Sequence, residues 1–295
     1  MSWKHQPPRV VLLGDRERAE DHLDRIRELV KRHADIVLED FDFQRSLSDV
    51  SADFGIVLGG DGSMLRAAKQ VAECELPVLG VNLGRLGFLA ALTPDELSLR
   101  LPKVCEGECR VVEHLMFHAE IWRDGQLEDR CLGLNEMAVL GGAPFSLLEV
   151  NLYVDAEWAT TYSCDGLIIS TPVGSTAHSL SAGGPILEKS LQAFVIQPIS
   201  PHTLTVRPVV DSASRTYEVQ VPRPNPGTAI VVDGRMWASD LSGNERIRIV
   251  RAPSSFRMIE VQNRNHYRTL REKLGWGGYL PSRRDPSDDA NPAKQ

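Results

Sequence analysis

The sequence lacks any long apolar run. No stretch approaches the roughly 18 apolar residues that a membrane-spanning helix needs, so we expect a protein that does not cross a membrane. The first residues, MSWKHQPPRV, also lack the apolar core of a secretory signal peptide. We therefore expect a cytoplasmic protein that has no membrane partner.

Cysteine is scarce, and its pattern predicts neither a disulfide framework nor a metal site. The 295-residue chain has 5 cysteines, an odd number at irregular spacing. We expect them all to be reduced thiols, mostly buried. Cys105 and Cys109 lie four residues apart, as do His114 and His118, but neither pair has the further ligands that a zinc site requires. The sequence therefore indicates no metal held by protein side chains.

Positive charge is also in short supply. The chain has 33 Lys and Arg residues against 40 Asp and Glu residues, which gives a formal net charge of -7. A nucleic-acid-binding protein would require a basic face, so we expect no nucleic-acid partner. The remaining composition, 42% hydrophobic and 25% charged, is that of a globular protein, and the length suggests about two domains.

Short apolar runs alternate with helical patterns as far as residue 110. Strand patterns occupy residues 9–14, 35–38, 54–58 and 77–81, and helical spacing occupies 18–33 and 64–74. Such alternation is typical of a parallel sheet with helices on both faces. We therefore predict a Rossmann-like α/β domain over residues 1–110.

The pattern changes after residue 110. Over residues 111–264 the apolar runs are short, often alternating, and separated by turn signals, which predicts an all-β, sandwich-like domain. Residues 265–278 are again helical, and we expect this helix to pack back on the first domain. The Pro-rich, charged residues 281–295 are typical of a disordered tail.

The stretch DGLIISTPVGSTAHSLSAGGPI, residues 165–186, combines a buried strand pattern with a turn rich in small and hydroxyl residues. Hydroxyls and backbone N–H groups at a sharp turn suit a polar ligand, and glycine and alanine let another surface approach the backbone. A core strand with a tight connection is the alternative. The density of small hydroxyl residues favours a pocket for a polar small molecule.

A second turn, Gly59-Gly60-Asp61-Gly62-Ser63, follows one predicted strand and precedes a helix. Glycines and a helix N-terminus let the backbone approach phosphate oxygens, so Gly59, Gly60, Gly62 and Ser63 form a candidate phosphate loop. Asp61 would act as a base toward a hydroxyl, or as a magnesium partner. The alternative is a plain turn in which Asp61 caps the helix. The loop matches neither the Walker pattern nor GxGxxG.

Two further motifs carry polar side chains between apolar runs. Asn135 and Glu136 offer one side chain that donates and accepts and one that accepts only. Such a pair suits a ribose diol or an adenine edge, and a turn or an exposed strand position is the alternative. The segment 232–235, Val-Asp-Gly-Arg, is a turn signature for which a simple hairpin is the favoured interpretation.

In this order, the motifs resemble those of the bacterial-type NAD kinases. The glycine-rich loop alone is weakly specific, because phosphofructokinases and the diacylglycerol and sphingosine kinases use a similar one. The long block after Asn-Glu is much more specific, and the resemblance spans residues 10–276. The matching segments are GGDGS (59–63), NLGRLGFL (82–89), NE (135–136), the block 165–186, PHTLTVRPVV (201–210), VDGR (232–235) and LREKLGW (270–276).

The resemblance implies an enzyme that transfers the γ-phosphoryl group of ATP to the 2′-hydroxyl of the adenosine ribose of NAD, giving NADP. It implies an α/β N-terminal domain, a β-sandwich C-terminal domain, and NAD in the cleft between them. Asp61 would be the general base. The NAD site would also include Gly62, Arg66, Asn135, Glu136, Asp165, Thr176, Ala177, His178, Ser179, Leu180, Ser181, Ser200 and Arg235.

The same resemblance implies the other components of the reaction. ATP would arrive as its magnesium complex, with the Mg²⁺ ion held mainly by phosphate oxygens. Subunits would assemble as a homodimer or homotetramer, in which the run 176–181 contacts a neighbour's ligand.

Four positions depart from the family pattern: Val173 replaces Thr, His178 replaces Tyr, Val206 replaces Asn, and Arg235 replaces Gln. His178 adds a titratable group and Arg235 adds a fixed positive charge. We hypothesise that these two changes shift substrate preference toward a more anionic ligand such as NADH, or alter regulation by NADP.

Two other functions share parts of this pattern. A lipid kinase would use the same glycine-rich loop, but no basic amphipathic stretch is present and the block 165–186 would be unexplained. A non-catalytic NAD(P)-binding sensor would keep the pocket. Retention of Asp61 argues against the sensor, because binding alone needs no base.

Overall fold

The computed structural model describes residues 2–84, 87–90, 92–143, 147–261 and 266–275. The described residues up to 261 belong to one compact unit and helix α5 (His266–Leu274) to another. The helix confirms the helical pattern predicted near residue 265, while its packing on the first domain stays a prediction. The predicted tail, residues 281–295, lies outside the described residues, as do Arg85, Leu86 and Trp276 of the family motifs.

The N-terminal domain is built on a parallel sheet, as predicted. Its strands are β1 (Arg9–Gly14), β2 (Asp35–Asp40), β3 (Phe54–Leu58) and β4 (Val78–Val81). They lie in the order β2-β1-β3-β4, and each neighbouring pair is parallel. Strand β3 is buried along its whole length, which explains its continuous apolar run. The residues after β3 therefore lie at the carboxyl edge of a central strand.

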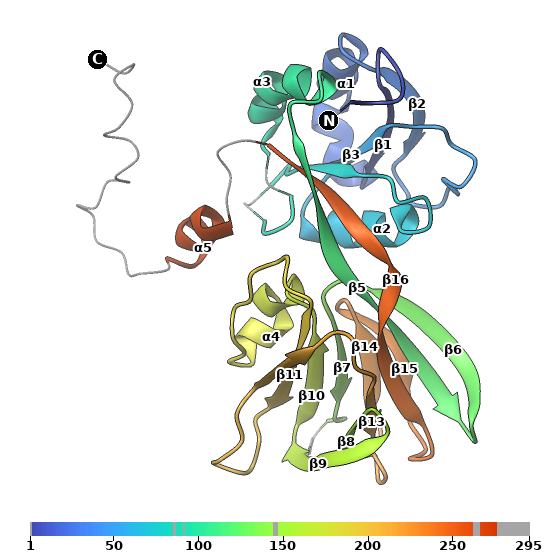
Figure 1. Ribbon diagram of the computed structural model, residues 1–295, viewed down its shortest axis with the longest axis vertical. Helices are drawn as coiled ribbons and strands as arrows, with labels where there is room; N and C mark the ends of the chain where they lie inside the picture. Colours follow the sequence, from blue (N-terminus) through green and yellow to red (C-terminus); the bar gives the residue numbers. More distant parts are fainter. Residues whose placement is uncertain (1, 85–86, 91, 144–146, 262–265, 276–295) are drawn as a thin grey trace. The chain divides into compact units, whose positions relative to one another are not determined.

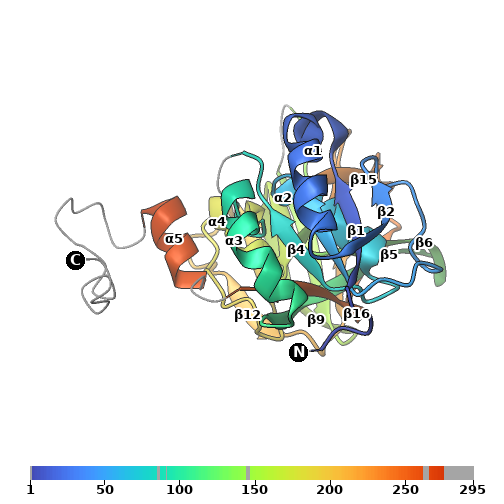
Figure 2. The same cartoon turned by 90° about the horizontal axis from the view of Figure 1, so that it is seen from above.

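Helices cover both faces of this sheet (Figure 2). They are α1 (Arg16–Lys31), α2 (Asp61–Val71) and α3 (Pro94–Cys105). Helices α1 and α3 pack in one apolar cluster, and α2 packs in the cluster on the opposite face. Helix α3 was not predicted, although Thr93 and Glu96 form a capping box at its start.

Two long antiparallel strands, β5 (Arg110–Arg123) and β16 (Arg246–Glu260), run from the N-terminal domain into the β-rich domain (Figure 1). Near its end, β16 joins the first sheet, where Met258 pairs in parallel with Val78 of β4. One sheet therefore continues through both domains. The sequence pattern gave no sign of this continuity, because each half of a long strand has an ordinary alternating pattern.

The C-terminal domain is a two-sheet sandwich, as predicted. Phe117, Phe194 and Tyr217 meet edge to face in its core, with ring centroids 6.4 and 5.7 Å apart. The remaining strands are β6 (Gln126–Gly133), β7 (Glu136–Leu140), β8 (Leu148–Val154), β9 (Glu157–Cys164), β10 (Gly166–Ser170), β11 (Ala193–Ile199), β12 (Val209–Ser212), β13 (Tyr217–Gln220), β14 (Ala229–Val232) and β15 (Arg235–Ser239). Among the described residues, the second sheet has the order β12-β11-β10-β7-β14-β15.

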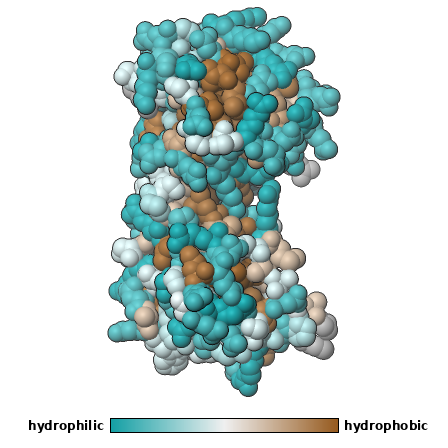
Figure 3. Space-filling view, turned by 90° about the vertical axis from the view of Figure 1, so that its right-hand side faces the viewer, coloured by the Kyte–Doolittle hydropathy of each residue, from teal (hydrophilic) through white to brown (hydrophobic). Residues whose placement is uncertain are grey.

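In the part of the chain that the structure describes, no helix is both long and apolar enough to cross a membrane, and the face in Figure 3 is mainly hydrophilic with separate apolar patches. All five cysteines are free thiols, as predicted. The prediction that most are buried was wrong, since Cys164 is buried, Cys74 is exposed and the other three are half-buried.

Candidate active site

The glycine-rich turn connects β3 directly to α2. The helix begins at Asp61, three residues earlier than the spacing predicted, so Gly62 and Ser63 lie in its first turn. Gly59 has φ 147°, a conformation that favours glycine, and a Cβ on it would lie 2.2 Å from Ser63 Oγ. The turn therefore requires glycine where the sequence has it, and it places Asp61 at the N-terminus of α2.

The carboxylate of Asp61 does not cap its own helix. The N-cap residue is Gly60, without a side-chain cap, so the capping alternative was wrong. Instead Asp61 Oδ2 accepts a hydrogen bond from the Phe88 N–H at 2.8 Å, and Oδ1 accepts from Leu89 at 2.9 Å and Ala90 at 3.3 Å. A Cβ on Gly87 would lie 2.1 Å from Asp61 Oδ1. Residues 87–90 thus form a close-fitting cradle for the Asp61 carboxylate.

Strand β7 pairs with β10, and this pairing places the Asn-Glu motif beside the block 165–186. Glu136 is opposite Ser170 in the register. The Thr171 N–H donates to the Asn135 carbonyl at 2.9 Å, and a Cβ on Gly174 would lie 2.1 Å from that same oxygen. Beyond β10 the chain forms a short 3₁₀ turn, Gly174–Thr176, and the single helical turn α4, His178–Ser181. The block therefore has the predicted strand, turn and helix start.

Glu136 is a buried carboxyl with an unusual environment. Its pKa is raised to about 8, mainly by burial and also by the nearby charge of Asp233, while a hydrogen bond from the backbone N–H of His178 opposes the rise. Glu136 Oε2 and Ser179 Oγ are buried and have no hydrogen-bond partner within the described part of the chain. Buried polar atoms normally have partners, so these two atoms mark a place where a polar ligand would complete the hydrogen bonding.

The segment 232–235 is the predicted hairpin. It joins β14 to β15 through a two-residue turn in which Asp233 and Gly234 have φ 51° and 73°, as a type I′ turn requires. The Asp233 side chain does more than form the turn. Its carboxylate accepts from the N–H groups of Leu134 and Asn135, at 3.1 and 2.7 Å. Burial raises its pKa. Asp233 therefore anchors the start of the Asn-Glu motif.

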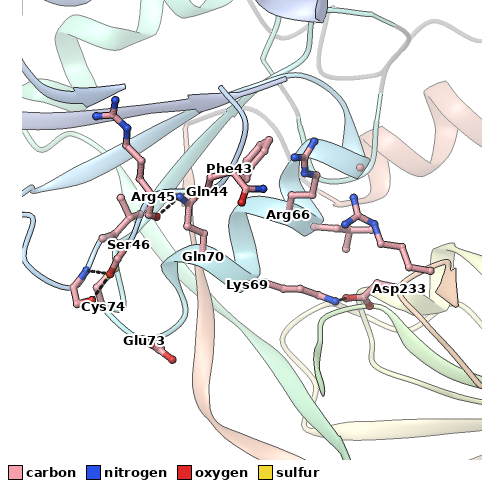
Figure 4. A pocket seen from close by; sticks show the side chains of 15 residues that line it. Phe43, Gln44, Arg45, Ser46, Arg66, Lys69, Gln70, Glu73, Cys74 and Asp233 are labelled. Carbon is pink, nitrogen blue, oxygen red and sulfur yellow. Dashed lines mark hydrogen bonds and ion pairs between the residues drawn. The ribbon is translucent and has the colours of Figure 1, made fainter. Parts of the chain in front are cut away.

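A cavity of about 560 Å³ lies beside α2. Four basic residues and two acidic ones are among its lining residues. Arg66 stacks over Phe43, with the guanidinium carbon 4.4 Å from the ring centroid, and it donates to the Asp42 carbonyl at 2.7 Å. Lys69 points toward Asp233 (Figure 4). The lining is Phe43, Gln44, Arg45, Ser46, Leu47, Ser48, Gly62, Leu65, Arg66, Lys69, Gln70, Glu73, Cys74, Asp233 and Arg235.

The structure brings most of the predicted site residues together, but not all of them. Gly62, Arg66 and Arg235 line the cavity, and Asn135, Glu136 and residues 176–181 lie around the end of β10. Asp165 and Ser200 lie at the opposite end of β10, where the Asp165 N–H donates to the Ile199 carbonyl. The five residues of that strand separate the two groups by roughly 17 Å.

Sequence reasoning missed several residues of this region. Lys69 was not singled out, although Gly62, Arg66 and Lys69 follow the three- and four-residue spacing of one helix face. Asp233 was assigned only to a turn, and Lys189, whose ammonium contacts the Asp61 cradle, was not considered. The helical spacing was a usable signal for Lys69. No local pattern would have identified Lys189.

The residues of the candidate site lie in segments that match known family domains. Residues 16–109 match the ATP-NAD kinase N-terminal domain and residues 134–261 match the ATP-NAD kinase C-terminal domain. The Asp61 turn lies in the first match, and Glu136, the block 165–186 and Asp233 lie in the second. The match thus covers both halves of the candidate site.

Curated relatives are similar over most of the chain. The chain is 52% identical over 280 residues to the NAD kinase of Rhodopirellula baltica, covering 94% of this chain and 90% of that protein. It is 42% identical over 229 residues to the NAD kinase of Shewanella halifaxensis, covering 77% of this chain and 74% of that protein.

Solved structures share the fold. A crystal structure of an NAD kinase from Archaeoglobus fulgidus in complex with ATP has a TM-score of 0.71 and 29% identity, covering 90% of this chain and 97% of that chain. The crystal structure of yeast NADH kinase complexed with NADH has a TM-score of 0.79 at 22% identity, covering 96% of this chain and 92% of that one. Two matching family domains and a 52% identical relative show that this chain belongs to the NAD kinase family.

Proposed function

We propose that this protein transfers the γ-phosphoryl group of ATP to the 2′-hydroxyl of the adenosine ribose of NAD, giving NADP and ADP. The observation that carries the proposal is the position of Asp61, at the end of a glycine turn and the first residue of α2, in a chain of the NAD kinase family. A lipid acceptor is disfavoured, because the chain also matches the family's C-terminal domain.

In the proposed reaction Asp61 accepts the proton of the 2′-hydroxyl as that oxygen attacks the γ-phosphorus and the bond to ADP breaks. A ribose hydroxyl is a weak nucleophile, and a positioned base assists it by a factor of about 10²–10⁴. The N–H groups of Phe88, Leu89 and Ala90 fix the orientation of the carboxylate. Most of the remaining acceleration comes from holding the reactants in line.

The cavity beside α2 supplies a complementary charge for the phosphates. Gly62, Arg66 and Arg235 line it, together with Arg45 and Lys69. Basic side chains and a helix N-terminus stabilise anionic oxygens, so we assign a phosphate-bearing part of the substrates to this cavity.

We assign the magnesium ion to the ATP complex. In the described ranges, no group of three or more His, Cys, Asp or Glu side chains is placed to hold a metal ion. We therefore propose that the magnesium ion is coordinated mainly by the phosphate oxygens of ATP. Bound there, the ion would neutralise charge that develops on the transferring group.

For the acceptor, we assign the adenosine part of NAD to the region around Asn135, Glu136 and residues 176–181. Glu136 Oε2 and Ser179 Oγ, both buried, are the atoms that would form hydrogen bonds with the ligand.

The position of Asp165 and Ser200 at the other end of β10 supports a homodimer or homotetramer, in which these residues act at a neighbour's site. Light scattering coupled to size exclusion would measure the assembly. We also propose that the protein is cytoplasmic.

The test is NADP formation from NAD, ATP and Mg²⁺, measured with an NADP-specific dehydrogenase. Asp61→Asn should retain NAD binding and lose most turnover, while Asp21→Asn, on the exposed face of α1, should match the wild type. Equal turnover in Asp61→Asn would remove Asp61 from the role of base. A wild-type protein that binds NAD without forming NADP would be a non-catalytic sensor instead.

A further inference from the structure

Lys189 connects the C-terminal domain to the cradle around Asp61. It follows the block 165–186, and its Nζ donates to the Phe88 carbonyl at 2.7 Å. The donor is an ammonium group, and hydrogen bonds with an ionised partner are roughly twice as strong as neutral ones. Lys189 is half-buried, so this contact is only partly screened by solvent.

The carbonyl that Lys189 contacts belongs to the same peptide unit as a cradle donor. The Phe88 C=O and the Leu89 N–H form one planar amide. That N–H donates to Asp61 Oδ1 at 2.9 Å, so the ammonium group and the carboxylate bind opposite ends of one amide dipole. Hydrogen bonds in such a chain polarise and strengthen one another. The interaction therefore holds this peptide unit against Asp61.

The backbone of Lys189 is itself held in place. His114 Nδ1 lies 3.5 Å from the Lys189 carbonyl. Burial and the charge of Lys189 lower the pKa of His114 to about 4, so the ring is neutral near pH 7. Two residues earlier, the Leu187 N–H donates to Ser175 Oγ at 3.0 Å. Lys189 is thus tied to β5 and to the 3₁₀ turn of the long block.

We propose that Lys189 is a positioning residue for the phosphoryl transfer, acting on Asp61 through the peptide unit between Phe88 and Leu89. The inference rests on the proposed function, and it names a residue outside the side chains that we assigned to proton transfer and to the phosphates. Lys189 links the block assigned to NAD with the carboxylate assigned as base.

The experiment compares Lys189→Met with Lys189→Arg and with a control, Lys103→Met, an exposed lysine in the last turn of α3. A displaced catalytic group loses up to about 10²-fold in rate, so kcat of Lys189→Met should fall by about 10- to 100-fold. Its KM for NAD should stay within about threefold, since the NAD-binding side chains are unchanged. Lys189→Arg should recover much of kcat, and Lys103→Met should match the wild type.

Hydrogen exchange of a peptide covering residues 87–92 supplies a readout independent of turnover. The amides of Phe88, Leu89 and Ala90 should exchange faster in Lys189→Met than in the wild type, and a purely global destabilisation would instead raise exchange throughout the chain. Should Lys189→Met not fold, Lys189→Gln takes its place.

An unchanged kcat together with unchanged exchange in this peptide would overturn the inference. A change confined to KM would also overturn it, by making Lys189 a binding residue. If the wild-type protein formed no NADP, the proposed function would be wrong, while the exchange comparison would still decide whether Lys189 holds the cradle.

Discussion

The ammonium group of Lys69 lies 3.5 Å from the carboxylate of Asp233. Lys69 comes from α2, whose first residue is Asp61, and Asp233 comes from the hairpin that binds the N–H groups of Leu134 and Asn135. The Asp233 side chain is 2% exposed and the Lys69 side chain 34% exposed. This ion pair therefore joins the helix that carries the proposed base to the strand that carries the Asn-Glu motif.

Replacing Lys69 should weaken this connection. Lys69→Met leaves a buried carboxylate without its cation, and we expect the free energy of unfolding to fall by about 1–3 kcal/mol. Urea denaturation would measure the change, with Lys103→Met as the control for loss of an exposed lysine. If the two variants had equal stability, Lys69 would contribute nothing through Asp233. A double-mutant cycle with Asp233→Asn would isolate the pair.

Glu136 should make the stability of the free protein depend on pH. Its pKa is raised from the ordinary 4.5 to about 8, so the folded state binds this proton more tightly than the unfolded state. Its contribution to stability is fully present below pH 4.5 and is lost as pH rises through about 8. Glu136→Gln does not titrate, so its stability relative to the wild type should rise by a few kcal/mol from pH 4.5 to 8.

Denaturation at pH 5, 6.5 and 8 would test this prediction. Asp233, whose pKa is also raised, is present in both proteins, and the charge that it places near Glu136 is part of the effect that the comparison measures. Glu157→Gln, an exposed position on β9, is the matched control and should follow the wild type at each pH. A constant difference between Glu136→Gln and the wild type would contradict the prediction.

Gly87→Ala should impair turnover through steric contact with Asp61. The new Cβ would lie 2.1 Å from Asp61 Oδ1, so either the carboxylate or the backbone of residues 87–90 must move. A shift of about 1 Å in a catalytic group costs up to about 10²-fold in rate. Gly84→Ala is the control, since its Cβ would meet no atom within 4 Å. Similar kcat values for both variants would show that the cradle tolerates the added methyl group.

Arg235 and His178 should influence the choice between NAD and NADH. NADH carries one more negative charge than NAD, and Arg235 lines the basic cavity. An exposed charge contributes about 0.2–1 kcal/mol, so Arg235→Gln should lower the ratio of kcat/KM for NADH over NAD by up to about fivefold. His178→Tyr restores the family residue and should shift the ratio in the same direction. An unchanged ratio in both variants would remove these positions from substrate choice.

The sequence determined the local structure well. The runs at residues 9–14 and 54–58 are strands with the predicted bounds, because a buried parallel strand has a continuous apolar run. The block after Asp165 is a strand, a turn and a short helix, since its glycines and hydroxyl residues allow little else. These features depend on residues that are close together in the sequence, and the family motifs can be recognised from short stretches of sequence in the same way.

The tertiary structure alone decided which groups face one another. Asp61 follows a predictable turn, but its carboxylate is held by N–H groups of Phe88, Leu89 and Ala90 rather than by its own helix. Lys69 meets Asp233, and Lys189 meets Phe88. Asp165, which the family resemblance placed in the NAD site with Glu136, lies at the other end of β10. Local patterns record propensity and periodicity, whereas these relationships involve residues far apart in the chain and depend on how each domain folds and how the two domains pack.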